Sequence, residues 1–488
     1  MSAIGYARLI ELWNLPVRLL DSPAQVSGAV NRRVVGEGKI LFPRGVAIED
    51  TPMGHLEFGL RHEGINLEVI DAVFDHLSPD DLVRRFEIAP NGTPIRRACF
   101  LWEWLRRPTL PVSAQPAGGY IDLFPDDVYL VAGQPSRHGK FRVRDNALGN
   151  ADFCPMVQRA GIPTEPSLQN LLMQAEQTLT ANDDAALFER ALNYLYLSET
   201  RSSFAIEKDP PSADRQARFV QLLRRAGETA VVDEDWLVSL QNAVVRDAFS
   251  QEASYRFRQN WLEDSTGQIT FLPPPPEVLR AAMHGWVSFI NDCQRRIDPL
   301  IKVACAAFGF VYLHPFMDGN GRLHRFLMHH ALGQALPSAA ARIVPVSAVI
   351  LKNLTEYQAV LAGFSRPTTR LWDYLRADIE PLVTRSPGGR PYRFFDATRE
   401  VAFLHKMIRL AVEEEIPRQL AWLKGYDRAQ QSLQAAFDLP NKDIAALIRM
   451  IESNEGKLSQ HRRKQYAHLP ETVLDRIEAC VRRAFNRD

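Results

Sequence analysis

The hydrophobic residues of this chain recur mostly at helical spacing, above all in its middle part. Four segments there place apolar residues at every third or fourth position and are predicted to be helices: 167–179, 185–197, 276–292 and 299–313. The last segment is apolar on every side from Leu300 to Leu313, with Lys302 as its one charged residue. A helix without a polar face is a buried helix. We therefore expect this segment at the centre of the core.

The flanking regions have other patterns. Residues 1 to about 165 combine a strand-like piece at 33–48 with helical patterns at 56–76 and 94–107, which indicates an α+β region. We expect this region to end where the helical part begins, near residue 166.

A linker is predicted where Ser-Pro-Gly-Gly-Arg-Pro begins at Ser386. Beyond it, helical patterns cover 395–423, with a break near Pro417, and later 442–452 and 471–485. The chain is thus predicted to be mainly α, with three domains: 1–165, 166–385 and 386–488.

Composition narrows the class of protein. Lys+Arg and Asp+Glu both number 58, so no net field draws the chain to nucleic acid or to an acidic membrane. The five cysteines are scattered without CxxC spacing, which favours reduced thiols over disulfides or zinc. Neither a secretory signal nor an apolar run of bilayer length is found. We expect a cytoplasmic protein without membrane association, although delivery by a dedicated secretion machine stays open.

Twelve residues at the end of the buried helix form a distinct motif: His314-Pro315-Phe316-Met317-Asp318-Gly319-Asn320-Gly321-Arg322-Leu323-His324-Arg325. Pro315 cannot continue the helix, because it lacks an N–H and its ring clashes with the preceding turn. Gly319 and Gly321 permit a tight turn. Apolar residues at helical spacing after Arg322 predict a second helix. Its first N–H groups are unpaired and its dipole is positive there, so an anion site is predicted.

The polar residues of the motif suit phosphate chemistry. Arg322 and Arg325 lie one helical turn apart, so their guanidinium groups share a face. Asp318 is a hard oxygen ligand of the kind that Mg²⁺ accepts beside phosphates. His314 can take a proton at neutral pH, and Asn320 can donate its amide to a phosphate oxygen. Phe316 is expected to be an apolar anchor beneath the loop.

The segment resembles, position by position, the HPFx[DE]GNGRxxR motif of the Fic family. The resemblance implies a helical Fic core with a small β-hairpin, the flap, which fits residues 260–271 before a run of prolines. It also implies a protein adenylyltransferase that moves AMP from ATP, with Mg²⁺, to a Ser, Thr or Tyr hydroxyl of a target protein. The chain itself is an alternative target.

The resemblance also implies roles for single residues. His314 takes the proton of the attacking hydroxyl, and Asp318 binds Mg²⁺. Tyr357 is a candidate for the adenine pocket, with a packing role as the alternative. The nucleotide-binding residues are expected to be Gly319, Asn320, Gly321, Arg322, Arg325 and Tyr357.

A second resemblance concerns inhibition. Ser203 and Glu207 occupy the fixed places of the Fic inhibitory motif [ST]xxxE[GN], while Lys208 departs from its last position. The family's second motif arginine holds the γ-phosphate. We therefore expect an inhibitory helix ahead of the core. Glu207 of this helix would pair with Arg325, so that Arg325 could no longer hold the γ-phosphate.

Several alternatives stay open. The same site could remove AMP from a modified target, or use another phosphate donor. Some Fic proteins carry a C-terminal winged helix, and residues 386–488 loosely resemble one. A basic cluster there, with Lys457 and Arg462, could bind DNA, but a helical packing or dimerisation module is favoured. A homo-oligomer remains open.

Overall fold

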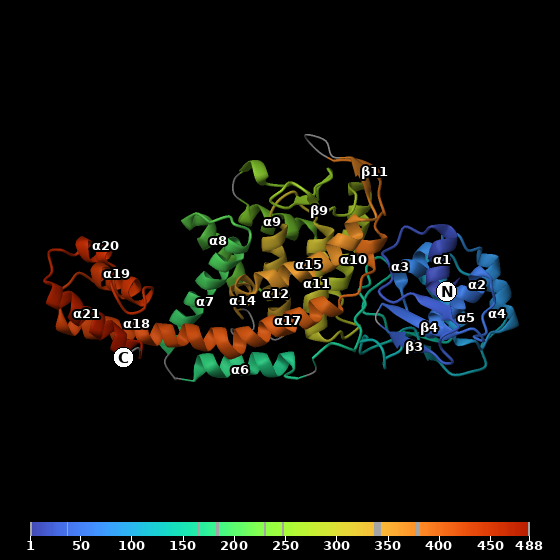
Figure 1. Cartoon of the computed structure of the whole chain (residues 1–488), viewed down its shortest axis with the longest axis horizontal. Coiled ribbons are helices and arrows are strands. Elements are labelled where there is room, and N and C mark those ends of the chain that lie inside the picture. Colours follow the sequence, from blue (N-terminus) through green and yellow to red (C-terminus); the bar gives the residue numbers. More distant parts are fainter. Residues whose placement is uncertain are drawn as a thin grey trace.

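The computed structural model describes residues 2–36, 38–163, 165–181, 185–228, 231–245, 248–335, 343–375 and 381–486. Three parts follow one another along the long axis, with the N-terminal part at one end and the C-terminal part at the other (Figure 1). Helices dominate all three parts, which confirms the predicted mainly α fold.

The N-terminal part contains small sheets among helices. Its four-stranded sheet has the order β1-β2-β4-β3, built from Ser2–Ala3, Ala24–Ser27, Lys39–Pro43 and Val34–Gly36. A three-stranded sheet has the order β5-β7-β6, from Ile121–Asp122, Val143–Asp145 and Ser136–His138. The helices α1 to α5 are Gly5–Trp13, Pro52–His62, Leu67–Val73, Pro79–Ile88 and Thr93–Arg106. The predicted α+β character is confirmed, and the strand-like piece at 33–48 contains two antiparallel strands, β3 and β4.

The central part is a bundle of helices with two hairpins. Its helices are α6 (Leu168–Thr180), α7 (Ala185–Ile206), α8 (Ala213–Arg224), α9 (Glu234–Val244), α10 (Pro276–Asn291), α11 (Pro299–Leu313), α12 (Asn320–Ala335), α14 (Val346–Lys352) and α15 (Leu354–Thr369). One hairpin pairs β8 (Leu262–Glu263) with β9 (Ile269–Phe271) and lies where the flap was predicted. The other pairs β10 (Asp373–Leu375) with β11 (Leu382–Arg385).

α11 forms the middle of this bundle. From Leu300 to Leu313 every residue except Lys302 is buried, as its uniform hydrophobicity predicted. The Asp298 side chain caps its first turn by accepting from the N–H of Leu300 at 2.9 Å. Gly309 has no side chain, and the Phe153 ring occupies the space that a Cβ would need. The helix is therefore packed on all sides, and its C-terminal end fixes the position at which the motif starts.

The first helices of the C-terminal part pack into the central core. This part contains α16 (Arg390–Arg393), α17 (Thr398–Leu410), a π-helical turn (Ala411–Glu415), α18 (Ile416–Ala436), α19 (Asn441–Glu452), α20 (Gln460–Gln465) and α21 (Glu471–Ala484). The predicted break near Pro417 is this π-helical turn, from which the proline is separated by Ile416. Residues up to Leu423 pack into the central core, and a separate core starts at Ala429.

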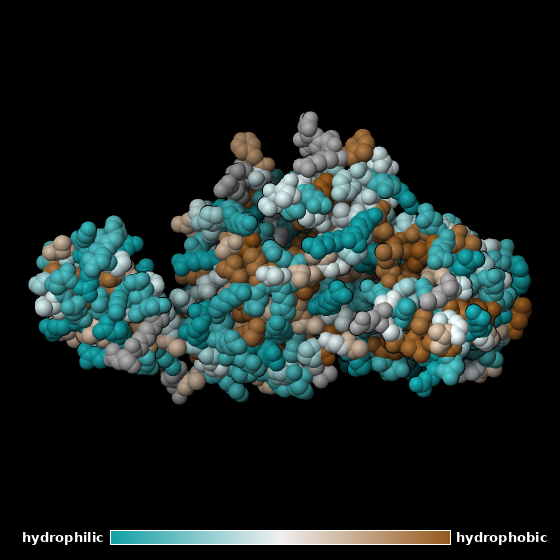
Figure 2. All heavy atoms as spheres, in the orientation of Figure 1, coloured by the Kyte–Doolittle hydropathy of each residue, from teal (hydrophilic) through white to brown (hydrophobic). Residues whose placement is uncertain are grey.

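The separate core that starts at Ala429 belongs to a small helical unit at the end of the C-terminal part. α18, α19 and α21 supply most of its buried residues, and its surface is largely hydrophilic in the view of Figure 2. Between residues 386 and 486, all of which the structure describes, there is no β-strand, so this part lacks the hairpin that the winged-helix resemblance implies. Among the helices of the described ranges, none combines the length and hydrophobicity needed to cross a bilayer.

A buried acid joins α11 to α17. The Tyr312 hydroxyl donates to Glu400 Oε1 at 2.7 Å, and burial raises the pKa of Glu400 to about 7. The folded state thus holds a proton that the unfolded chain releases above its ordinary pKa of 4.5, so stability falls as pH rises from there through about 7.

We therefore predict that Glu400→Gln raises the melting temperature at pH 8 by about 3 °C, because glutamine cannot ionise. At pH 5 the wild-type carboxyl is already protonated, and the two proteins should melt together. Thermal unfolding at both pH values measures this. An equal difference at pH 5 and pH 8 would mean that Glu400 is not the titrating group.

Candidate functional site

The motif starts where α11 stops. His314 has a left-handed backbone (φ 50°), and its N–H closes the helix by donating to the Phe310 carbonyl at 2.9 Å. The buried Arg256 braces this corner, since its Nε donates to the His314 carbonyl at 2.9 Å and its Nη2 to the Pro274 carbonyl at 2.6 Å. Arg256 precedes the flap and thus ties the flap to the motif. Arg256 carries no signal in the sequence, because no local pattern links it to a residue 58 positions later.

The His314 ring is buried beside the flap. Its Nδ1 lies 3.2 Å from the Val311 carbonyl, which requires the proton on Nδ1 and leaves the lone pair on Nε2. Burial lowers the pKa of His314 to about 4, against the raising effect of the Val311 carbonyl. The imidazole is therefore neutral at physiological pH and can accept a proton through Nε2.

The glycine loop is held by Asn320. Its Oδ1 accepts from the Phe316 N–H at 3.1 Å, and its Nδ2 donates to the Phe316 carbonyl at 2.7 Å. The amide thus closes the loop, a role that the sequence did not indicate, and its predicted contact with a phosphate stays a prediction. Asn260 donates to the same carbonyl at 3.0 Å, and the Phe316 side chain is buried, as predicted. Gly319 has φ 90°, a conformation that residues with a Cβ resist.

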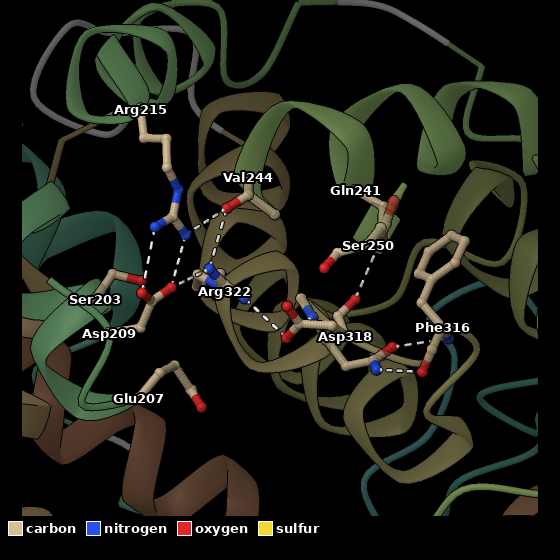
Figure 3. Close-up of polar contacts among 12 residues, drawn as sticks. Ser203, Glu207, Asp209, Arg215, Gln241, Val244, Ser250, Phe316, Asp318 and Arg322 are labelled. Carbon is tan, nitrogen blue, oxygen red and sulfur yellow. Dashed lines mark hydrogen bonds and ion pairs between the residues drawn. The ribbon is translucent and has the colours of Figure 1, made fainter. Parts of the chain in front are cut away.

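The segment resembling the inhibitory motif forms the end of α7. The Lys208 N–H donates to the Ala205 carbonyl at 3.0 Å and the Asp209 N–H to the Phe204 carbonyl at 3.2 Å, while Lys208 has φ 54°. This is a Schellman cap, whose left-handed position usually holds Gly or Asn. Lys208 thus adopts the conformation expected of the residue it replaces. The cap presents Glu207 and Asp209 to the motif (Figure 3).

Glu207 pairs with Arg325, as the resemblance implied. Their Oε1 and Nη2 atoms lie 2.8 Å apart. Ser203 holds the same guanidinium twice, since Nε donates to its Oγ at 2.9 Å and Nη2 to its carbonyl at 2.8 Å. Arg325 is buried, whereas the Glu207 side chain is 37% exposed. Arg325 is therefore held in place, whereas the Glu207 carboxylate can rotate into solvent.

The Glu207 carboxylate also lies against the start of α12. A Cβ placed on Gly321 would be 2.1 Å from Glu207 Oε1. The carboxylate therefore fills the space beside the helix N-terminus, where the free N–H groups and the helix dipole favour an anion. The chain's own carboxylate thus lies where the sequence predicted an anion site.

Arg322 and Asp318 form the other side of the site. Arg322 Nη2 lies 2.9 Å from Asp318 Oδ1, and this carboxylate also accepts from the Gly319 N–H at 2.6 Å. Arg322 is buried, but the Asp318 side chain is 51% exposed. Within the described ranges no cluster of three or more His, Cys, Asp or Glu side chains could hold a metal. Asp318 thus offers one oxygen donor, which fits Mg²⁺ whose other ligands are phosphates and water.

Tyr357 lies behind the site. It is buried, and its ring stacks on His324 at 6.1 Å and on Phe403 at 5.9 Å. Burial raises the pKa of Tyr357 to about 12, while the nearby Arg325 lowers it. The structure thus places this residue in the packing behind Arg325, which matches the packing alternative rather than an open adenine pocket.

Known proteins share the motif region. Residues 231–332 match the family model described as the Fic/DOC family. Over 125 residues the chain is 30% identical to a protein adenylyltransferase Fic of Nematostella vectensis, which covers 25% of this chain and 27% of that protein. It is also 30% identical, over 172 residues, to a probable protein adenylyltransferase of Aquifex aeolicus, covering 31% and 52% of the two chains. The chain thus spans about a quarter of the first relative and about half of the second. The crystal structure of a Fic family protein from Desulfovibrio desulfuricans G20 superposes with a TM-score of 0.37 at 18% identity, over 64% of this chain and 87% of that one.

Proposed function

We propose that this chain, whose residues 231–332 belong to the Fic/DOC family, is a protein adenylyltransferase that moves AMP from ATP to a hydroxyl of a target protein. The observation that carries the proposal is the start of α12, the helix of Arg322 and Arg325, where the Glu207 carboxylate lies against Gly321 and pairs with Arg325. A site built to hold an anion beside a neutral imidazole suits the transfer of a phosphate group. The adenylyltransferase names of the two relatives support the choice of AMP as the group.

In the proposed reaction the target oxygen attacks the α-phosphorus of ATP. A bond forms between these two atoms, the bond from the α-phosphorus to the bridging oxygen breaks, and pyrophosphate leaves. His314 Nε2 takes the hydroxyl proton, because Nδ1 keeps its own proton on the Val311 carbonyl. The N–H groups at the start of α12 stabilise the charge that develops on the phosphate oxygens.

The two arginines orient the triphosphate. Arg325 would hold the terminal phosphate once Glu207 leaves it, and Arg322 would hold an inner one. Mg²⁺, when bound at Asp318, would neutralise phosphate charge. We propose that the chain inhibits itself, because Glu207 pairs with Arg325 and occupies the space of the phosphate.

The target is proposed to present a Ser, Thr or Tyr side chain beside the flap, whose strand β9 ends at Phe271 close to the His314 ring. The chain itself is an alternative target. All five cysteines are unpaired, which supports the cytoplasm as the place of the reaction.

Labelled ATP tests the proposal. The Glu207→Gly variant is incubated with Mg²⁺ and ATP labelled at either the α- or the γ-phosphate, and protein-bound label is measured. We expect label from α-labelled ATP alone. Label from the γ-position would indicate phosphate transfer, and release of AMP from a modified protein would indicate the reverse reaction. If neither label becomes bound to the chain itself or to a protein of an added cell extract, the proposed function is wrong.

The shared use of the Gly321 space gives a second test. Gly321→Ala places a Cβ where both the Glu207 carboxylate and the proposed phosphate belong. In the Glu207→Gly background we expect ATP affinity to fall by about tenfold or more, measured by calorimetry. Gly363→Ala, in the middle of α15, is the matched control and should leave the affinity unchanged. Unchanged affinity in Gly321→Ala would show that no phosphate lies there.

A further inference from the structure

Asp209 links two buried arginines of the site. It accepts from Arg215 Nη2 at 2.6 Å and from Arg322 Nη1 at 2.7 Å (Figure 3). Both guanidinium groups also donate to the Val244 carbonyl at 3.0 Å and lie over the Phe204 ring, at 4.9 and 5.4 Å. The relative exposures of the Arg215 and Arg322 side chains are 5% and 3%. Asp209 is thus part of a rigid array behind the motif.

The contacts of Arg322 divide its guanidinium into two edges. Asp209 and the Val244 carbonyl take Nη1. On the opposite edge, Nη2 donates to Asp318, while Nε is buried and has no hydrogen-bond partner among the described residues. The Nε and Nη2 donors point in parallel, which is the geometry that binds a phosphate or carboxylate through two oxygens. Of these two donors only Nη2 has a partner, and that partner is the exposed side chain of Asp318.

Arg325 is held in the opposite way. Its Nε and Nη2 donors are both taken, by Ser203 and Glu207. The same cap at the end of α7 therefore carries two carboxylates with different positions. Glu207 shares Nη2 of Arg325 with Ser203, whereas Asp209 holds Arg322 through Nη1 and leaves the Nε–Nη2 edge of Arg322 toward the loop.

We infer that Asp209, neutralised on its far side by Arg215, is a positioning residue for phosphate binding. It fixes Nη1 of Arg322 so that the Nε–Nη2 edge faces the anion site, and a phosphate completes that edge when Asp318 turns away. The inference rests on the proposed function for the identity of the ligand, but the geometry itself requires only a phosphate. It also implies that the end of α7 stays in place when inhibition is lifted, and that the Glu207 side chain alone moves.

The test measures phosphate binding and AMP transfer separately. In the Glu207→Gly background, calorimetry gives the affinity for ATP and for inorganic tripolyphosphate. We expect Asp209→Asn to weaken both by about tenfold or more, and Asp209→Glu to restore most of the loss. Asp214→Asn on α8, whose exposed carboxylate pairs with Arg218, is the matched control and should change neither affinity.

A double-mutant cycle separates positioning from general damage. Once Arg322→Lys has removed the two-donor edge, Asp209→Asn should weaken tripolyphosphate by less than about twofold more, because residues that act through one another are not additive. If Asp209→Asn only damaged the structure, it would weaken tripolyphosphate binding in the Arg322→Lys background as much as in its absence.

The outcomes distinguish the two proposals. Unchanged or tighter tripolyphosphate binding by Asp209→Asn overturns the inference, and tighter binding would make Asp209 a second inhibitory carboxylate. Failure of the Glu207→Gly chain to bind tripolyphosphate also overturns it. If binding follows the expectation but α-labelled ATP leaves no label, the positioning role stands and the proposed transferase function fails.

Discussion

Alanine in place of His314 is expected to slow AMP transfer by about 10²–10⁴-fold, the range that a general base contributes. His314 is the ring that faces the flap at the end of α11, and its Nε2 lone pair is the proton acceptor of the proposed step. The change is made in the Glu207→Gly background, where the rate of α-label incorporation is measured. ATP affinity should change little, since the imidazole acts on the target hydroxyl rather than on the phosphates.

His284→Ala is the matched control for this prediction. His284 is an exposed residue of α10, so its loss should leave the rate unchanged. Transfer by His314→Ala at the full rate would remove His314 from the chemistry.

The pH profile gives the same residue a second signature. Because burial lowers the pKa of His314 to about 4, the ring remains neutral and able to accept a proton down to that pH. We therefore expect no loss of rate from the protonation of His314 between pH 8 and pH 6. A half-maximal rate near pH 6.5 that disappears in His314→Ala would mean that the ring keeps its ordinary pKa.

The second large effect is expected from Glu207→Gly, which should raise self-labelling by about tenfold or more. The wild-type carboxylate pairs with Arg325 at 2.8 Å and fills the space beside Gly321. At an effective dielectric near 20 an ion pair is worth up to about 4 kcal/mol before desolvation and solvent screening, which reduce it for a carboxylate that is partly exposed. A net of about 1.4 kcal/mol is sufficient for a tenfold effect.

The comparison uses equal protein concentrations and initial rates of label incorporation. Glu228→Gly is the matched control, because this glutamate is exposed and its ion pair is with Arg225, three residues before it. Equal labelling with and without the Glu207 carboxylate would remove self-inhibition from the proposal.

The physical route of release follows from the exposures. Arg325 is buried and held by Ser203 through two hydrogen bonds, so it does not move easily. Glu207 has a partly exposed side chain, and its backbone is set in the Schellman cap. Rotation of this one side chain would free one N–H of Arg325 Nη2 and the space beside Gly321, while Ser203 keeps its two hydrogen bonds to the guanidinium.

Sequence reasoning succeeded where a residue's surroundings are fixed by its chain neighbours. The uniform hydrophobicity of 300–313 predicted a buried helix, and Pro315 with the two glycines predicted its end and the turn that follows. The contact between Glu207 and Arg325 was predicted from motif resemblance rather than from local physics. The structure contains that contact at 2.8 Å.

Sequence reasoning did not find the contacts of side chains that have a choice of partners. The amide of Asn320 bonds to the backbone of Phe316, a contact that the sequence did not indicate. The linker at 386 was expected to end the central domain, but the central core continues to Leu423, because α17 packs against α11.

By itself, then, the sequence determined the buried helix, the glycine turn and the chemical groups around that turn. Each of these follows from steric and hydrophobic properties of adjacent residues. Only the tertiary structure decided that Arg256 holds the His314 carbonyl, that Asp209 bridges Arg215 and Arg322, and that the Glu207 carboxylate lies against Gly321. Those contacts join segments far apart in the chain, and hydrogen bonds between them depend on packing that no local pattern encodes.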